Sequence, residues 1–461
     1  MSKVGTTDQQ VLESVAEMQP VAVERLKALV RIPSVSNGAH EDSLRASASL
    51  ISGMLHDTGL FDTIEEIRPT TAGGDVGKPT IVATRAAKDG APTVLMYSHH
   101  DVQPANDPEE WTTDPFDPVI IGGRLHGRGS ADDKAGFIVQ LGALDSLRQQ
   151  TAGNPSLGIF MLVEGEEEIG SPTFERLLEL VGDKIEADAI IITDSENWDS
   201  STPALVRSLR GQANFDVSIS TLEHGLHSGI SGGVFPDAMV PMARLLASFH
   251  HADGSVAVRG LDDGPEETEA IDGSVLRSEQ GVLPGVTEIG TGTFAERLWA
   301  KPTVTVTGLS LPHPESAVSM LVPRVIARVS VRLAPDQDAD KALAALRAHI
   351  AEHTPFGAHV EFTPRGVTRG VMATKDGGLR DTMKRSLTDG WGAPVVESGT
   401  GGSASLVSLL ATRYPDAHIL LTGVLDPLSR AHSPNESVSL DILHKAMAAH
   451  ALFLVRLERS R

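Results

Sequence analysis

The 461-residue sequence contains no cysteine. Disulfide bonds are therefore impossible, and so is any zinc site built from thiolates. A metal ion bound to this chain would have to take imidazole and carboxylate ligands.

Basic residues are few relative to acidic ones. The chain has 39 Lys and Arg against 61 Asp and Glu, which gives a formal net charge of -22. Phosphate binding needs basic patches, so this balance argues against nucleic acid and anionic membranes as partners. A solvated acidic surface is the commonest cause of such a balance, and the charge is also compatible with divalent cations.

Long apolar runs are missing as well. No stretch approaches the run of about eighteen apolar residues that a membrane helix requires. The first ten residues lack the basic and apolar regions of a signal peptide, so we expect a cytoplasmic protein. The chain is too long for one ordinary core, and we expect two domains.

Most of the chain alternates between strand and helix patterns. Apolar residues recur at helical spacing over 8–30, 134–147 and 171–181. Continuous apolar runs at 93–98, 156–164, 187–194 and 418–426 are typical of strands that are covered on both faces. The pattern predicts an α/β fold with a largely parallel sheet.

A different pattern begins near Gly211. Strands with period two and amphipathic helices follow in the order β-α-β-β-α-β, which predicts a ferredoxin-like α+β domain. We predict one domain from residues 1–209 and 376–461, with a second domain, 210–375, inserted into it. The Gly- and acid-rich stretch 252–274 is expected to be a surface insertion.

Polar clusters follow the predicted buried strands. These clusters contain His99 and Asp101, Glu164 to Glu168, Asp194, and His432, while Asp132 and Asp133 start a predicted helix. Carboxyl ends of parallel strands meet at one edge of a sheet, so these side chains should converge there. Carboxylates crowded together without cations would repel one another or be forced to protonate. A metal site is the simplest resolution.

Charge counting favours two divalent ions. Asp132, Glu168 and Asp194 offset three of their four positive charges, and a bridging hydroxide offsets the fourth. His99 and His432 would complete the shells as neutral imidazoles. Zinc accepts this ligand set, and manganese or cobalt would suit it too. The adjacent Glu167 is then free to act as a base toward water.

Seven motifs carry a family resemblance. In order along the chain they are "YSHHDVQP", "GRGSADDKAG", "EGEEEIGS", "TDSEN", "GLHSGISGG", "GTGGSAS" and "AHSPNES". Together they resemble the carnosinase, aminoacylase and carboxypeptidase G family of co-catalytic zinc hydrolases, over essentially the whole chain. The long inserted domain and "LHSGISGG" most resemble the carnosinase and cytosolic non-specific dipeptidase branch.

The resemblance implies roles for the strand-end residues. His99, Asp132 and Asp194 would bind one metal ion, and Asp132, Glu168 and His432 the other, with Asp132 bridging. Asp101 would orient His99, a task that fixes the tautomer of the imidazole. Glu167 would be the general base.

The same resemblance implies roles in the inserted domain, which would act as lid and dimerisation domain. His227 would reach into the neighbouring subunit's site and stabilise the oxyanion, which implies a homodimer. Arg332 would bind the substrate carboxylate, where a bidentate guanidinium fits well. Gly401, Gly402 and Ser403 resemble the substrate-binding loop.

Several positions have competitors nearby. A one-place slip among Glu166, Glu167 and Glu168 is open, Glu196 competes with Asp194, His224 with His227, and Arg324 and Arg328 with Arg332. Alternation along an extended segment places His100 opposite His99. Asp133 is interpreted as a helix N-cap or first-turn acid.

The sequence departs from the family at three positions, so the resemblance does not decide the shape of the substrate pocket. Gly399 stands where dipeptidases and carnosinases often have arginine, His126 where many relatives have tyrosine, and Met320 where Thr or Asn is common. The roles of His100 and His126 are also open.

The leading hypothesis is metal-dependent hydrolysis of an amide bond by a dipeptidase. The alternative within the family is an N-acyl-amino-acid deacylase or desuccinylase. Other classes are a serine hydrolase using Ser403, although "GTGGSAS" is not G-x-S-x-G, and a catalytically silent binding protein. The expected partner is a small peptide or N-acyl amino acid, with no nucleic acid and no membrane.

Overall fold

The computed structural model describes residues 6–38, 40–182, 185–267, 269–375 and 377–460. The chain forms two compact units, and each is described by itself. The first comprises Met1–Arg207, Ala373–Ser398 and Leu409–Arg461, and the second comprises Ser208–Met372 and Gly399–Ser408. The segment Gly399–Ser408, which lies inside the expected span 376–461, is thus grouped with the second unit.

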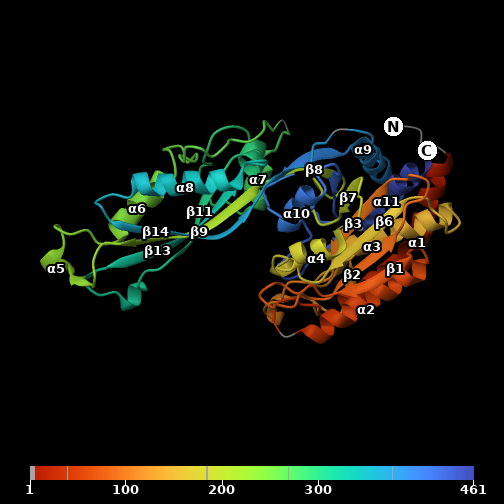
Figure 1. Ribbon diagram of the computed structural model, residues 1–461, viewed down its shortest axis with the longest axis horizontal. Coiled ribbons are helices and arrows are strands. Elements are labelled where there is room, and N and C mark those ends of the chain that lie inside the picture. Colours follow the sequence, from red (N-terminus) through yellow and green to blue (C-terminus); the bar gives the residue numbers. More distant parts are fainter. Residues whose placement is uncertain (1–5, 39, 183–184, 268, 376, 461) are drawn as a thin grey trace. The chain divides into compact units, whose positions relative to one another are not determined.

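The helices and strands of the first unit come from both ends of the chain (Figure 1). They are α1 (Thr6–Val30), α2 (Glu41–Thr58), β1 (Thr63–Ile67), β2 (Thr80–Arg85), β3 (Thr93–His99), η1 (Pro108–Glu110), β4 (Val119–Ile121), β5 (Arg124–His126), α3 (Lys134–Gln150), β6 (Gly158–Glu164), η2 (Glu167–Ile169), α4 (Phe174–Val181), β7 (Ala189–Ile192), β8 (Ala204–Leu209), β15 (Val371–Met372), α9 (Gly378–Trp391), β16 (Val396–Thr400), α10 (Ser405–Arg413), β17 (His418–Leu421), β18 (Ser437–Ser439) and α11 (Leu440–Arg459). Of these, β15 belongs to the second unit, although it pairs with β8 in the main sheet, and β8, β16 and α10 each contain residues of both units.

The main sheet has the strand order β1-β2-β6-β3-β7-β17-β8-β15, and β16 pairs with β8. Its four central strands, β6, β3, β7 and β17, are parallel, while the flanking pairs are antiparallel. The central strands are the four continuous apolar runs of the sequence. The prediction of an α/β fold with a largely parallel sheet is confirmed.

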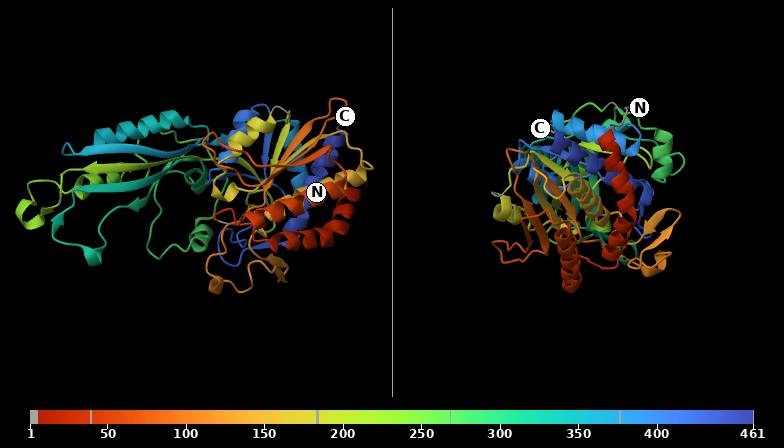
Figure 2. Two further views of the ribbon diagram at one scale, coloured as in Figure 1. Left: turned by 60° about the horizontal axis from the view of Figure 1, so that its bottom comes forward. Right: turned by 90° about the vertical axis from the view of Figure 1, so that its right-hand side faces the viewer.

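Alternate side chains of β3 enter different sides of the sheet. Val94 and Met96 belong to a core shared with α1, α2, α3, α9 and α11. Tyr97 faces the other side, where its ring meets Phe174 of α4 edge-on at 5.8 Å. Helices therefore cover both faces, as Figure 2 shows for α1 and α2 on one of them. This double cover explains why the strand sequences are apolar throughout rather than alternating.

The second unit is built on an antiparallel sheet. Its elements are β9 (Gly211–Ser220), β10 (Leu226–His227), α5 (Ser228–Ser231), α6 (Met239–Ser248), α7 (Gly273–Glu279), the π-helix η4 (Glu296–Ala300), β11 (Thr303–Leu309), η5 (Pro314–Ser316), β12 (Met320–Leu321), β13 (Arg324–Leu333), α8 (Ala339–His353) and β14 (His359–Thr368). The strand order β11-β13-β9-β14, with α6 and α8 packed together on the sheet, is the expected ferredoxin-like arrangement.

No helix within the described residues is both long enough and apolar enough to cross a membrane.

The packing of α9 on α11 gives a stability prediction. A Cβ added at Gly390 in α9 would lie 2.8 Å from the Ala449 backbone nitrogen of α11, so Gly390→Ala forces two backbones apart. We expect this substitution to lower the free energy of unfolding by about 1–3 kcal/mol, measured by urea unfolding. Gly53 in α2 is the matched control, because nothing lies within 4 Å of its added Cβ. Gly53→Ala should be neutral or stabilising by up to about 1 kcal/mol, and equal effects at both positions would contradict the packing argument.

Candidate metal centre

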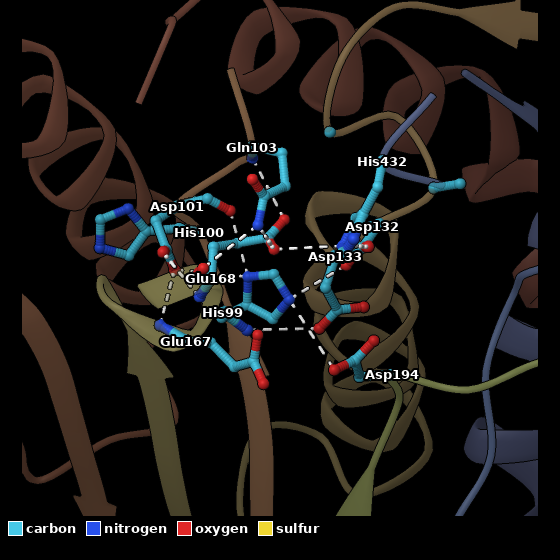
Figure 3. Close-up of polar contacts among 12 residues, drawn as sticks. His99, His100, Asp101, Gln103, Asp132, Asp133, Glu167, Glu168, Asp194 and His432 are labelled. Atoms are coloured by element: carbon cyan, nitrogen blue, oxygen red, sulfur yellow. Dashed lines mark hydrogen bonds and ion pairs between the residues drawn. The ribbon is translucent and has the colours of Figure 1, made fainter. Parts of the chain in front are cut away.

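The candidate site lies at the carboxyl edge of the parallel strands (Figure 3). β3 ends at His99, which is in register with Glu164 at the end of β6. β7 ends at Ile192, two residues before Asp194. The loop before α3 supplies Asp132, whose peptide bond with the next residue is cis. The convergence expected of these strand ends is present in the structure.

Asp132 lies between two histidines. Its Oδ1 is 3.2 Å from His99 Nε2, and its Oδ2 is 3.0 Å from His432 Nε2. His99 Nε2 is also 3.8 Å from Asp194 Oδ2, and His432 Nε2 is 3.1 Å from Glu168 Oε2. The result is two ligand groups that share Asp132, and in each group one potential ligand atom per residue lies within 4.8 Å of the others.

The charges of this cluster suit a divalent cation. In the described part of the chain, these carboxylates form ion pairs with the two histidines and not with lysine or arginine. Burial, and then the charge of Asp132, raises the pKa of Asp194 to about 7. Hydrogen bonds to Asp132 and Glu168 raise the pKa of His432 to about 10. The cluster therefore combines nitrogen and oxygen donors with excess negative charge. A divalent metal ion that binds such a cluster replaces the protons that would otherwise neutralise it.

Asp101 connects the histidine to the glutamate turn. His99 Nδ1 lies 3.4 Å from Asp101 Oδ1 and 3.1 Å from the Asp101 backbone oxygen. The same carboxylate accepts hydrogen bonds from the backbone nitrogens of Glu167 and Glu168, both at 3.1 Å. Asp101 therefore lies where it can orient His99 and fix the η2 turn at once.

The three successive glutamates have different environments. Glu166 turns to the fold, where its carboxylate accepts hydrogen bonds from the Lys78 nitrogen at 2.9 Å and the Thr173 nitrogen at 2.8 Å. Glu168 enters the second ligand group, and Gln103 Nε2 donates to its Oε2 at 2.8 Å. Glu166 is thus occupied elsewhere, and Glu168 is the glutamate of the three that belongs to a candidate metal-binding group. Glu196, the competitor of Asp194, belongs to neither group.

Glu167 lies beside the first ligand group. In Figure 3 its carboxylate is on the side of His99 and Asp194. Burial, together with the negative charges of Asp194 and Glu168, holds the pKa of Glu167 well above its usual value. A carboxylate with raised basicity is suited to accept a proton near neutral pH.

Sequence reasoning missed the role of two buried acids. Asp133 is the N-cap residue of α3, but its side chain makes no capping hydrogen bond; its Oδ2 instead accepts a hydrogen bond from the His99 nitrogen at 3.2 Å. Glu436 accepts hydrogen bonds from the nitrogens of Ala131 at 2.9 Å and Asp132 at 3.1 Å, and from Arg128 at 2.7 Å. The signal for Glu436 was its place in the "AHSPNES" motif, four residues after His432.

His100 and His126 lie outside both ligand groups. The ring of His100 is fully buried and its Nε2 lies 2.9 Å from the Pro79 oxygen, pointing away from the cluster (Figure 3). Burial lowers its pKa to about 4. His126 ends β5, where it pairs with Ser437 of β18.

The predicted carboxylate-binding residues are together in the second unit. Arg332 donates to Ser403 Oγ at 2.8 Å, and Ser403 donates in turn to the Arg210 oxygen at 2.6 Å. The competing arginines are paired with acids: Arg324 with Glu361, and Arg328 with Asp216. Ser403 forms these hydrogen bonds without a histidine, so nothing in its described contacts supports a serine nucleophile.

His227 is exposed in the second unit. Its Nδ1 accepts a hydrogen bond from the Gly229 nitrogen at 3.1 Å, and it pairs with Met320 between β10 and β12. His224 is exposed as well. The expected contribution of His227 to a neighbouring subunit stays a prediction.

A family model described as peptidase family M20/M25/M40 matches residues 95–456. The chain belongs to this family. It is 32% identical over 421 residues, 90% of each chain, to a protein named Cysteinylglycine-S-conjugate dipeptidase from Corynebacterium striatum. It is 27% identical over 364 residues, 74% of each chain, to a Cys-Gly metallodipeptidase of Saccharomyces cerevisiae.

The solved structures agree on the fold. Human carnosine dipeptidase 1 superimposes with a TM-score of 0.78 over 99% of this chain and 100% of that chain, at 22% identity. The resemblance drawn from the seven motifs is confirmed, and the chain is a hydrolase of the M20/M25/M40 family. This membership and the two ligand groups support the use of a divalent metal.

The hydrogen bonds of Glu436 predict a loss of metal affinity when it is replaced. Glu436→Gln removes the charge that Arg128 pairs with and puts an amide against N–H donors, so the Asp132 loop should loosen. We expect metal affinity to fall by about 10–100-fold, measured by calorimetric titration. Glu458→Gln is the matched control and should leave metal affinity unchanged. Glu458 also accepts hydrogen bonds from backbone nitrogens, those of Ser156 and Leu157, but these lie just before β6, near the opposite edge of the sheet. Wild-type affinity in Glu436→Gln would show that these bonds do not hold the ligand.

Proposed function

We propose that this chain is a dipeptidase that hydrolyses the amide bond of short peptides with two divalent metal ions. The observation that carries the proposal is the position of Asp132 between His99 and His432, with Asp194 and Glu168 completing two groups. Two nitrogen donors and three carboxylates suit zinc, and manganese and cobalt are the alternatives.

The relatives support the choice of a dipeptide substrate. The proteins from Corynebacterium striatum and Saccharomyces cerevisiae are both named as dipeptidases, and a human relative 26% identical over 319 residues is named Beta-Ala-His dipeptidase. Their named dipeptides differ, so the chemistry that they share is hydrolysis of the amide bond of a dipeptide.

In the proposed reaction, Glu167 handles the protons. Divalent metal ions polarise a carbonyl and lower the pKa of water. Glu167 takes a proton from the attacking water and then delivers it to the nitrogen of the leaving amine. Asp101 keeps the Glu167 turn and the His99 ring in one arrangement throughout.

The second unit carries the residues that we assign to substrate binding. We assign the substrate carboxylate to Arg332, with Gly401, Gly402 and Ser403 as the adjoining loop, and the oxyanion to His227 from the other copy in a homodimer. Residues 210–375 would serve as lid and dimerisation domain. The cytoplasmic location expected from the sequence belongs to the same proposal.

Metal removal tests the function directly. Dialysis against a chelator should abolish hydrolysis of a dipeptide panel, because removal of the metal ions leaves nothing to polarise the carbonyl or to lower the pKa of the attacking water. Re-addition of Zn²⁺, Mn²⁺ or Co²⁺ should restore it, and metal analysis should give two ions per chain. Activity on N-acetyl or N-succinyl amino acids with no dipeptide cleaved would replace the dipeptidase with a deacylase. Full activity after chelation would end the proposal.

A second prediction separates the base from the ligands. Glu167→Gln should lower kcat by at least about 100-fold while two ions stay bound, because the base is lost and the ligand atoms are not. His432→Ala is the contrast, since it removes a ligand atom and should cost metal occupancy. Metal loss in Glu167→Gln would mean that Glu167 is a ligand.

A further inference from the structure

Arg210 lies between β8 and β9 and is largely buried, with 9% of its surface exposed. Its Nε donates to the Gly401 oxygen at 3.2 Å, and its NH1 group donates to the Lys301 oxygen at 3.3 Å. Its backbone oxygen accepts the hydrogen bond from Ser403. One residue therefore fixes both ends of the Gly401–Ser403 loop.

The loop fits closely over the guanidinium. A Cβ added at Gly401 would lie 2.9 Å from the Arg210 NH2 group and 2.9 Å from the Leu298 oxygen. At Gly399 an added Cβ would lie 2.5 Å from Trp299 Cβ. Glycine at 401 thus lets the backbone lie directly on Arg210, and Trp299 occupies the place that a side chain at 399 would take.

The charge of Arg210 has no acidic counterpart in the described residues. Its acceptors are backbone oxygens, and Arg332 contacts the neutral Ser403 hydroxyl. Arg324 and Arg328, on the same strand as Arg332, are both paired with carboxylates. Burial, and then the charge of Arg332, lowers the pKa of Arg210 to about 10. Burying a charge without a partner is costly, so a pair of such guanidinium groups favours an anionic ligand.

We propose that Arg210 is a specificity-determining residue that holds the Gly401–Ser403 loop against Arg332 and contributes positive charge favouring a substrate with a free carboxylate. This inference rests on the proposed function, because it concerns the end of the peptide that Arg332 would bind. Ser403 connects the two arginines, so displacement of Arg210 also displaces the group that positions Arg332.

The test compares a dipeptide with its C-terminal amide, using wild type and the Arg210→Met and Arg210→Lys variants. If the wild type hydrolyses N-acyl amino acids and not dipeptides, an N-acyl amino acid and its C-terminal amide take the place of this pair. In Arg210→Met the preference for the free acid over the amide in kcat/KM should fall by about tenfold or more, through KM. Arg210→Lys keeps the charge and should recover most of the preference.

Arg328→Met is the matched control, because Arg328 lies on the same sheet but its guanidinium is paired with Asp216 at 2.8 Å. It should leave the preference unchanged. If Arg210→Met does not fold, Gly401→Ala disturbs the same contact from the other side and should lower the preference likewise. An unchanged preference in the folded variants, or an equal loss in Arg210→Lys and Arg210→Met, overturns the proposal.

These outcomes are distinct from failure of the proposed function, which would appear as a wild type that cleaves neither substrate. Calorimetric binding of the acid and the amide to wild type and Arg210→Met then gives the same comparison without turnover. Equal loss of affinity for both compounds would overturn the role of the charge.

Discussion

The Asp132 carboxylate is the contact on which the candidate centre depends. Each of its oxygens faces a different histidine, so both ligand groups require it in one orientation. Glu436 holds the loop that carries it, through the backbone nitrogens of Ala131 and Asp132. Because His432 and Glu436 are four residues apart, one segment supplies a candidate ligand and also holds the loop of the carboxylate that the two groups share.

Four acids around the centre form two pairs, which their contacts distinguish. Glu166 and Glu436 accept from backbone nitrogens, which satisfy their oxygens and hold loops together. Asp132 and Asp194 instead face imidazole nitrogens and each other's charge. An acid satisfied by fixed N–H donors has no need of a cation, whereas acids facing one another do. The cation is therefore expected at the second pair.

The parallel sheet and its polar edge could be predicted from the sequence for one physical reason. Strands covered on both faces must be apolar throughout, so the polar residues that follow each strand stand out, and parallel strands bring these residues to one edge. Asp133 and Glu436 could not be assigned in this way. An acid at a helix start or in a loop is common, and only the contact with the His99 or Asp132 nitrogen gives it a role. The grouping of Gly399–Ser408 with the second unit could not be predicted either, because the hydrophobic period of the sequence does not change at its ends.

The Ser403 hydroxyl shows how contacts decide between chemical classes that a motif leaves open. A hydroxyl has one hydrogen, and here it is donated to the Arg210 oxygen at 2.6 Å. The oxygen also accepts from Arg332 at 2.8 Å, which draws electron density away from it. A nucleophilic serine needs the opposite arrangement, with its hydrogen directed at a base and its lone pairs free. Ser403 therefore connects the Arg332 guanidinium with the Arg210 backbone, an arrangement that does not suit attack on a carbonyl.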